Sequence, residues 1–208
     1  MSESEAVRCA LQIAALLLEL HRLPERLVHG DLKPANLIWH KGKVALLDFG
    51  AAMGQHRENI GKERERGIYY TPGYVAPELL QGSYPSVESD VYGLGAVLFY
   101  LLTGQDPKRR GGICPIREEN PALSRKMELL IQKCTNMAAS ERYHSIEEVI
   151  QELTEMAEGR YLPIWKRKAG KKREGCRYHK QFQTIQNILL TDGKSQSFVL
   201  NYSEERLS

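Results

Sequence analysis

His29-Gly30-Asp31-Leu32-Lys33-Pro34-Ala35-Asn36 is the stretch of this 208-residue chain on which the fold assignment depends. Its polar side chains and its proline predict a loop. Residues 5–22 before it are apolar on nearly every side and predict a buried helix that ends at Pro24. Leu37 to His40 and Lys43 to Leu47 after it flank a Lys-Gly turn and predict a small two-stranded hairpin. We therefore expect the loop between a helix and a hairpin.

Three further helices are expected downstream. The most apolar one should run from about Asp90 to Leu102, with Ser89 as its N-cap and Thr103-Gly104 as its end. Amphipathic helices are expected at about Ser124 to Asn136 and at Ile146 to Glu158, the second preceded by a serine cap at position 145.

Ala51 to Val75 does not follow the period of a helix or a strand. This segment is rich in charge and glycine, so we expect a long, mobile loop of the kind that usually has a functional role. Together with the segments above, the predicted fold class is mainly α (α+β), with one small β-hairpin beside the polar loop.

Four polar residues in and after the loop make up one chemical set: Asp31, Lys33, Asn36 and Asp48. Taken alone each is ordinary, because Asp and Asn are common turn residues and the triplet Asp48-Phe49-Gly50 is short enough to occur by chance. Phosphoryl transfer, however, needs mainly positioned charge. It uses a carboxylate that orients the attacking hydroxyl, a lysine near the transferred phosphate and oxygen ligands for Mg²⁺. The four residues supply that set in the expected order.

In these motifs the chain resembles the catalytic, C-terminal lobe of eukaryotic-type serine/threonine protein kinases, over roughly residues 5–157. His29 to Asn36 resembles the catalytic loop, and Asp48-Phe49-Gly50 the metal-binding triplet. Ala76-Pro77-Glu78 resembles the end of the activation segment, and Ser89 to Gly95 the start of the buried central helix of the lobe. Arg142 stands where the family has the ion-pair partner of Glu78.

The resemblance implies ATP and Mg²⁺ as cofactors and a protein Ser/Thr hydroxyl as substrate. Asp31 would be the catalytic base, Lys33 would neutralise the transferred phosphate, and Asn36 and Asp48 would hold Mg²⁺. The Asp-Leu-Lys-Pro order resembles serine/threonine kinases more than tyrosine kinases. Thr71, which would belong to the substrate pocket, indicates the same specificity.

The same resemblance gives supporting roles to His29, Glu78, Asp90 and Arg142. Asp90 would accept backbone hydrogen bonds from the catalytic loop. The alternative for Asp90 is an acid that merely favours a helix N-terminus. We prefer the supporting role, because the helix that Asp90 opens is too apolar for a surface element.

The family's Gly-rich phosphate loop and strand lysine are expected upstream of the catalytic loop. Here 28 residues precede His29, the first glycine is Gly30, and residues 1–32 contain no lysine. We therefore expect a C-terminal lobe whose N-terminal lobe is absent, with a half-built ATP site that is open to water and inactive alone. A separate polypeptide that supplies the N-terminal lobe is a possible partner.

Gly30 also stands where many kinases have an arginine that binds a phosphorylated activation loop. Ala51 to Ile68 contains no Ser or Thr, so we do not expect loop phosphorylation to switch this protein. Two alternatives to an active kinase stay open. The first is a non-catalytic, pseudokinase-like binding or scaffold protein. The second is a small-molecule phosphotransferase of the aminoglycoside or choline type, which shares the His-Gly-Asp start but lacks the activation segment and its Glu–Arg pair.

Charge divides the chain near Gly159. Residues 159–208 hold 11 Lys+Arg against 4 Asp+Glu, a net charge of +7, and since the whole chain carries +3, residues 1–158 carry −4. We expect a kinase C-lobe at residues 1–158 and a basic tail of unknown structure at residues 159–208. The eight cations within Lys166 to Lys180 would attract an anionic membrane surface or nucleic acid, although a solvated linker is the preferred interpretation.

Composition and cysteine spacing favour a cytoplasmic protein. With 42% hydrophobic and 26% charged residues, the chain fits neither a disordered, a collagenous nor a membrane-bundle class. The four cysteines lie far apart without a CxxC pair, so reduced thiols are expected rather than a zinc site or a disulfide framework. The acidic N-terminus does not resemble a signal peptide. The longest charge-free stretch, Val91 to Gln105, has 15 residues, fewer than the roughly 20 that a transmembrane helix needs.

Overall fold

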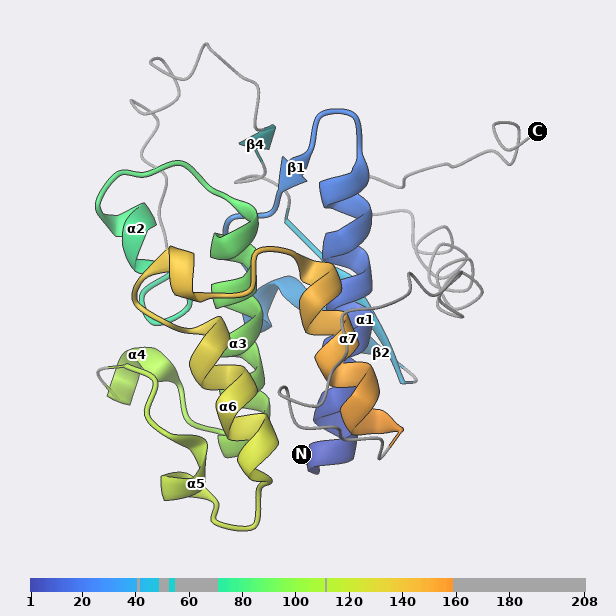
Figure 1. The fold of residues 1–208 in the computed structure, drawn as a ribbon, viewed down its shortest axis with the longest axis vertical. Coiled ribbons are helices and arrows are strands. Elements are labelled where there is room, and N and C mark those ends of the chain that lie inside the picture. Colours follow the sequence, from blue (N-terminus) through green and yellow to red (C-terminus); the bar gives the residue numbers. More distant parts are fainter. Residues whose placement is uncertain (41, 49–52, 55–70, 111, 159–208) are drawn as a thin grey trace, which may run out of the picture.

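The protein is represented by a computed structural model, which describes residues 1–40, 42–48, 53–54, 71–110 and 112–158. Within these ranges helices predominate, and the strands form two separate two-stranded antiparallel sheets (Figure 1). The predicted mainly helical class with a small antiparallel sheet is therefore confirmed. The basic tail from residue 159 onward and most of Ala51 to Val75 lie outside the described residues, so the expectations for them stay predictions.

α1 (Glu3–Arg22) is the buried helix predicted before the polar loop, and it begins two residues earlier than the sequence pattern indicated. Ser2 and Glu5 form a capping box, in which the Glu5 backbone N–H donates to the Ser2 hydroxyl and the Glu5 carboxylate accepts from the Ser2 N–H. The helix ends at Arg22, because the residue before Pro24 takes extended backbone. α1 packs against at least four other elements, which explains why its apolar residues are spread around the helix.

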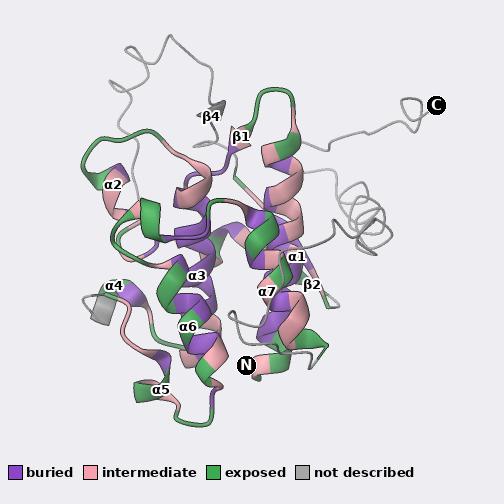
Figure 2. Cartoon of the chain, in the orientation of Figure 1, coloured by how far each residue is buried: buried purple, intermediate pink, exposed green. Residues whose placement is uncertain are grey.

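α3 (Val87–Thr103) runs through the middle of the molecule and is buried over most of its length (Figure 2). The prediction of Ser89 as its N-cap is wrong. The N-cap is Ser86, whose extended backbone offers a carbonyl to the N–H groups of Ser89 and Asp90. Ser89 is the third helical residue and closes a capping box by accepting from the Ser86 N–H. Gly104 ends the helix in a left-handed conformation (φ +69°), as expected.

The predicted hairpin is present as β2 (Leu37–His40) and β3 (Lys43–Leu46), with Leu37 opposite Leu46 and His40 opposite Lys43. Gln12 of α1 binds the turn end of β3. Its amide Nε2 donates to the Gly42 carbonyl at 3.0 Å and its Oε1 accepts from the Val44 N–H at 3.0 Å. These two bonds hold the hairpin on the helix.

A second sheet joins β1 (Leu27–Val28) to β4 (Met53–Gly54). The sequence does not signal it, because strands of two residues are too short to show alternation. This sheet links the residues just before the polar loop to those that follow Asp48 by five and six positions.

The other helices comprise three short ones and two amphipathic ones. α7 is capped by Ser145, as predicted, and α6 is capped by Ser124, which the sequence pattern had placed as the first residue of that helix. Each hydroxyl accepts a backbone N–H of the first turn. Their bounds are α2 (Pro77–Leu80), α4 (Pro107–Arg110), α5 (Ile116–Glu119), α6 (Arg125–Cys134) and α7 (Ile146–Ala157), with 3₁₀ turns at η1 (Pro34–Asn36) and η4 (Ala139–Glu141). Among the helices of the described ranges, none combines the length and apolar character needed to cross a bilayer.

Candidate active site

The polar loop His29 to Asn36 is held against the end of the hairpin. The Leu47 N–H donates to the Asn36 carbonyl at 2.8 Å, and the His29 Nε2 lies 3.3 Å from the Leu47 carbonyl oxygen. Asp48 follows Leu47 directly, so these contacts bring its backbone to the loop that carries Asp31. Asp48 has a φ of +57°, a left-handed conformation that Asp tolerates better than most residues.

Asp31 is the centre of a hydrogen-bonded cluster. The Lys33 Nζ donates to the Asp31 carboxylate at 2.5 Å and to the Thr71 hydroxyl at 2.9 Å. The Asn36 Nδ2 donates to the Asp31 carbonyl at 2.9 Å and approaches its carboxylate at 3.4 Å. Thr71 is 40 residues downstream of Asp31 in sequence, yet one ammonium group joins the two side chains. The fold thus assembles the predicted base, lysine, amide and substrate-pocket residue in one place.

Asn36 and Asp48 offer oxygen atoms of the kind that Mg²⁺ prefers. Because the amide nitrogen of Asn36 donates to Asp31, the amide oxygen is the atom left for a ligand, and the carboxylate of Asp48 lies at an exposed position. No group of three or more His, Cys, Asp or Glu side chains able to hold a metal occurs in the described part of the chain. Asn36 and Asp48 therefore fit a Mg²⁺ ion whose other ligands would be water and phosphate oxygens.

Asp90 fixes the backbone of the polar loop from below. Its side chain is fully buried, one oxygen accepts from the Gly30 N–H at 2.8 Å, and the other accepts from the His29 N–H at 2.9 Å. Gly30 has a φ of +76°, which glycine adopts without strain. The carboxylate therefore bonds to the loop and does more than complement the dipole of α3.

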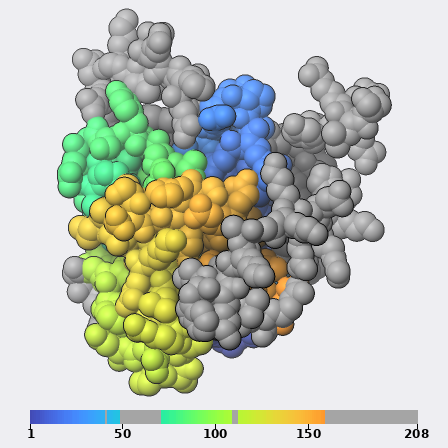
Figure 3. Space-filling view, viewed as in Figure 1, coloured from blue at the N-terminus to red at the C-terminus, as the bar shows by residue number. Residues whose placement is uncertain are grey.

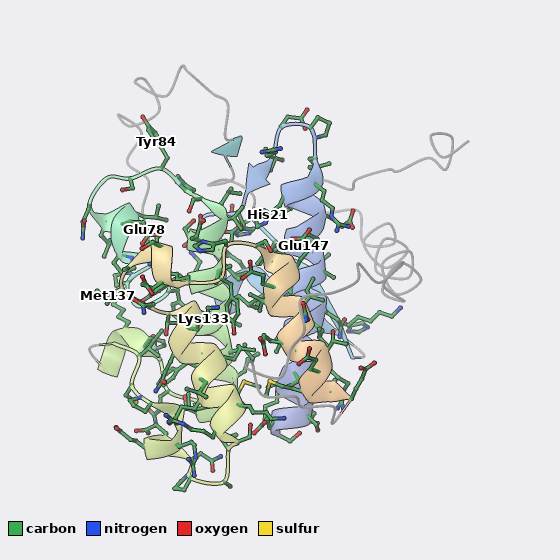
Figure 4. All side chains as sticks on the ribbon, viewed as in Figure 1. His21, Glu78, Tyr84, Lys133, Met137 and Glu147 are labelled. Carbon is green, nitrogen blue, oxygen red and sulfur yellow. The ribbon has the colours of Figure 1, made fainter. Side chains whose placement is uncertain are left out.

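His21 is a participant that the sequence did not single out. Its Nε2 lies 2.8 Å from the same Asp90 oxygen that accepts the His29 N–H, and its side chain is 9% exposed (Figure 4). The sequence carried no specific signal for this role, because His21 is one of several polar residues at the end of α1. Two helices far apart in sequence thus meet at Asp90 beneath the loop.

Glu78 and Arg142 form a bidentate ion pair, with both N···O distances at 2.7 Å. Arg142 is 1% exposed, and its guanidinium lies 5.0 Å from the centre of the Tyr92 ring. Burial, opposed in part by Arg142, raises the pKa of Tyr92. In Figure 3 the green segment that contains Glu78 lies directly beside the orange segment before α7, and this ion pair joins them.

The arrangement can orient a hydroxyl and neutralise negative charge. A carboxylate, an ammonium group, an amide and a threonine hydroxyl converge from the loop and from residue 71, and buried groups fix the loop from behind. Positioned charge of this type is the main protein contribution to phosphoryl transfer.

Comparisons with known proteins agree with this geometry. Residues 1–155 match the protein kinase domain family. The chain is 29% identical over 163 residues to the serine/threonine-protein kinase PknD of Protochlamydia amoebophila. This match covers 64% of this chain and 17% of that protein. It is 28% identical to the probable serine/threonine-protein kinase PknB of Lactococcus lactis (74% of this chain, 26% of that protein) and 30% identical to the serine/threonine-protein kinase PrkC of Bacillus subtilis (70% and 24%).

The matched segment is a small part of each relative, since the chain spans about a sixth to a quarter of their lengths. The family match over residues 1–155 includes every described residue of the loop, of α3 and of the Glu78–Arg142 pair. The chain therefore belongs to the protein kinase domain family, and the relatives named here are serine/threonine kinases.

Proposed function

We propose that this chain is the C-terminal lobe of a serine/threonine protein kinase and transfers a phosphoryl group from ATP to a protein hydroxyl. The observation that supports this best is the hydrogen-bonded series Asp31–Lys33–Thr71, at 2.5 and 2.9 Å, on a loop that Asp90 fixes. Such a series pairs a base with a cation beside the point where a substrate would lie.

Asp31 would orient the substrate hydroxyl and take its proton during transfer. Lys33 would stabilise the charge on the transferred group, and its second bond, to Thr71, limits how far the ammonium can move from the base. Thr71 would meet the substrate backbone near the phosphoacceptor. His29, Glu78, Asp90 and Arg142 would act as supports that hold this geometry.

Asn36 and Asp48 would hold Mg²⁺, which when bound neutralises charge on the phosphate oxygens. The bond from the Asn36 amide to the Asp31 carbonyl fixes the rotamer of that side chain beside the base. The bond between the Leu47 N–H and the Asn36 carbonyl sets the spacing between the two ligand positions through the backbone. Both ligands thus depend on the same loop as the base.

The residues before His29 contain neither a Gly-rich loop nor a lysine. The proposal therefore requires that both elements come from outside residues 1–208. A separate N-terminal-lobe polypeptide is one possible source. We place the reaction in the cytoplasm, in keeping with the unpaired cysteines Cys9, Cys114 and Cys134 in the described residues.

The test is thermal unfolding with and without Mg-ATP, in the presence of an N-terminal-lobe fragment that supplies the Gly-rich loop and the lysine. We expect the nucleotide to raise the Tm of the wild-type chain, because a ligand that binds only the folded state stabilises it. Asp48→Ala should abolish the shift. Glu25→Ala, at an exposed acid on the turn after α1, is the matched control and should keep it.

Turnover is tested separately, by radiolabel transfer to a generic Ser/Thr substrate in the presence of an N-terminal-lobe fragment. Asp31→Ala should keep most of the nucleotide shift and lose transfer, because the base acts on the hydroxyl and not on the nucleotide. If neither the wild type nor any variant responds to Mg-ATP, the non-catalytic binding or scaffold function is the correct one.

A further inference from the structure

The sequence of α4 contains three consecutive cationic residues, and the start of this helix lies beside the loop that carries Thr71. Lys108, Arg109 and Arg110 belong to α4, and they form the only run of three Lys or Arg residues in residues 1–158, a region with a net charge of −4. Lys108 is exposed. The one acid next to the run, Asp106, accepts the backbone N–H of Lys108 at 3.0 Å. The run is therefore a local concentration of positive charge in the sequence of an otherwise acidic lobe.

Gly73 brings this run against the Thr71 loop. A Cβ atom at Gly73 would lie 2.5 Å from the backbone nitrogen of Lys108 and 3.0 Å from the carbonyl carbon of Pro107. Gly73 also has a φ of +90°, so both the close approach and the backbone conformation require glycine. Tyr74 reports the same proximity, because burial and then the nearby Asp106 carboxylate raise its pKa. The backbone of the loop thus touches the first turn of α4.

The contacts lead from Asp31 to α4 without a gap. Lys33 joins Asp31 to Thr71, and Thr71 is two residues from Gly73, which touches Lys108. Figure 1 shows α2, which follows this loop, and α4 on the same side of α3. An extended peptide advances about 3.3 Å per residue, so a substrate whose hydroxyl lies at Asp31 and whose chain follows the Thr71–Tyr74 loop would bring residues near the phosphoacceptor toward α4.

We infer that the surface formed by the Thr71–Tyr74 loop and α4 selects protein substrates with acidic residues close to the phosphoacceptor Ser or Thr. This inference rests on the proposed function and names its substrate class. A peptide carboxylate would meet the exposed ammonium of Lys108, whereas a basic peptide would be repelled by the same charge. Solvent-exposed ion pairs are weak, so each acid is expected to improve binding by up to about five-fold.

The experiment compares two fluorescein-labelled peptides by fluorescence anisotropy with the full chain. Each has one central Ser in an Ala/Gly background, with two Glu on either side in one peptide and two Lys in the other. We expect the Glu peptide to bind at least five-fold more tightly, and the advantage to shrink with added salt. Lys108→Glu should remove or reverse the preference.

Arg8→Glu is the matched control, because it makes the same change of net charge at an exposed position of α1. It should leave the preference intact. Equal binding of the two peptides by the wild type would overturn the inference, as would a preference that survives the combined Lys108→Glu, Arg109→Glu and Arg110→Glu variant. An equal loss with Arg8→Glu would also overturn it, since net charge alone would then explain the binding.

Binding is measured without phosphoryl transfer, so this test and that of the proposed function can fail independently. A Lys108-dependent preference in a chain that does not respond to Mg-ATP supports the acidic-peptide surface and removes the kinase activity. A Mg-ATP response that Asp48→Ala abolishes, together with equal peptide binding, supports the kinase and removes the acidic substrate class.

Discussion

Arg142 and Glu78, 64 residues apart in sequence, bond through two parallel N–H···O contacts of 2.7 Å each. The three other guanidinium N–H groups donate to backbone carbonyls of Glu88, Asn136 and Met137. All five donors of a buried arginine are therefore used, which is the condition under which a buried charge is tolerated. One side chain connects α2, the start of α3 and the segment before α7.

Arg142→Lys should destabilise the fold by about 3 kcal/mol, because an ammonium group cannot reproduce a planar five-donor arrangement and leaves buried carbonyls unpaired. Urea unfolding gives the free energy. Arg22→Lys, in the exposed pair with Glu147, is the matched control and should cost less than about 1 kcal/mol. Equal costs at the two positions would show that the buried pair has no special role in stability.

His21→Leu should loosen the catalytic loop, because Asp90 would lose one of three donors and the other two belong to the loop backbone. We expect faster amide hydrogen exchange at His29 and Gly30 than the change in global stability explains. His21→Gln retains a donor near the Nε2 position and should restore slow exchange. If both variants exchange alike, the imidazole does not fix the loop through Asp90.

Gly95→Ala should destabilise the protein by about 1–3 kcal/mol, although alanine is the better helix former. An added Cβ in α3 would lie 2.6 Å from the Cβ of Cys134 and 2.7 Å from the Cγ2 of Thr135, at the end of α6. Gly104→Ala separates this packing effect from backbone strain, because nothing lies within 4 Å there and only the left-handed φ opposes the change. A stabilised Gly95→Ala variant would mean that α3 and α6 move apart at little cost.

Stability should fall at alkaline pH. Burial raises the pKa of the Cys9 thiol to about 11 and that of Cys134 to about 12, from an ordinary value of 9.0. The unfolded state loses these protons first, so the contribution is complete below about pH 9 and is lost as the pH rises through 11 to 12. Between about pH 9 and the raised pKa, each thiol lowers the free energy of unfolding by at most about 1.4 kcal/mol per pH unit.

Chemical denaturation between pH 8 and 11 measures this decline. Cys134→Ala should flatten it, whereas Cys114→Ala, at a half-exposed thiol, should leave it in place. A decline that is unchanged by the loss of Cys134 would assign the effect to other groups.

Local sequence was sufficient for the elements that depend on local physics. The apolar residues around α1, the serine cap of α7, and the hairpin next to the polar loop all follow from neighbours within a few positions. The N-cap of α3 was wrong because two serines precede the same apolar run, and only the backbone at Ser86 decides which of them stands outside the helix. The two-residue strands carry no periodic signal.

The residue types needed for phosphoryl transfer, their order and the family were readable from the chain, because side-chain chemistry and motif spacing are properties of the sequence. The tertiary structure decided which atoms meet: Lys33 with Thr71, His21 with Asp90, and Gly73 with Lys108. These pairs are separated by 35 to 69 positions, and no local propensity acts over such distances. They form only because packing around the buried α3 helix brings distant segments of the chain together.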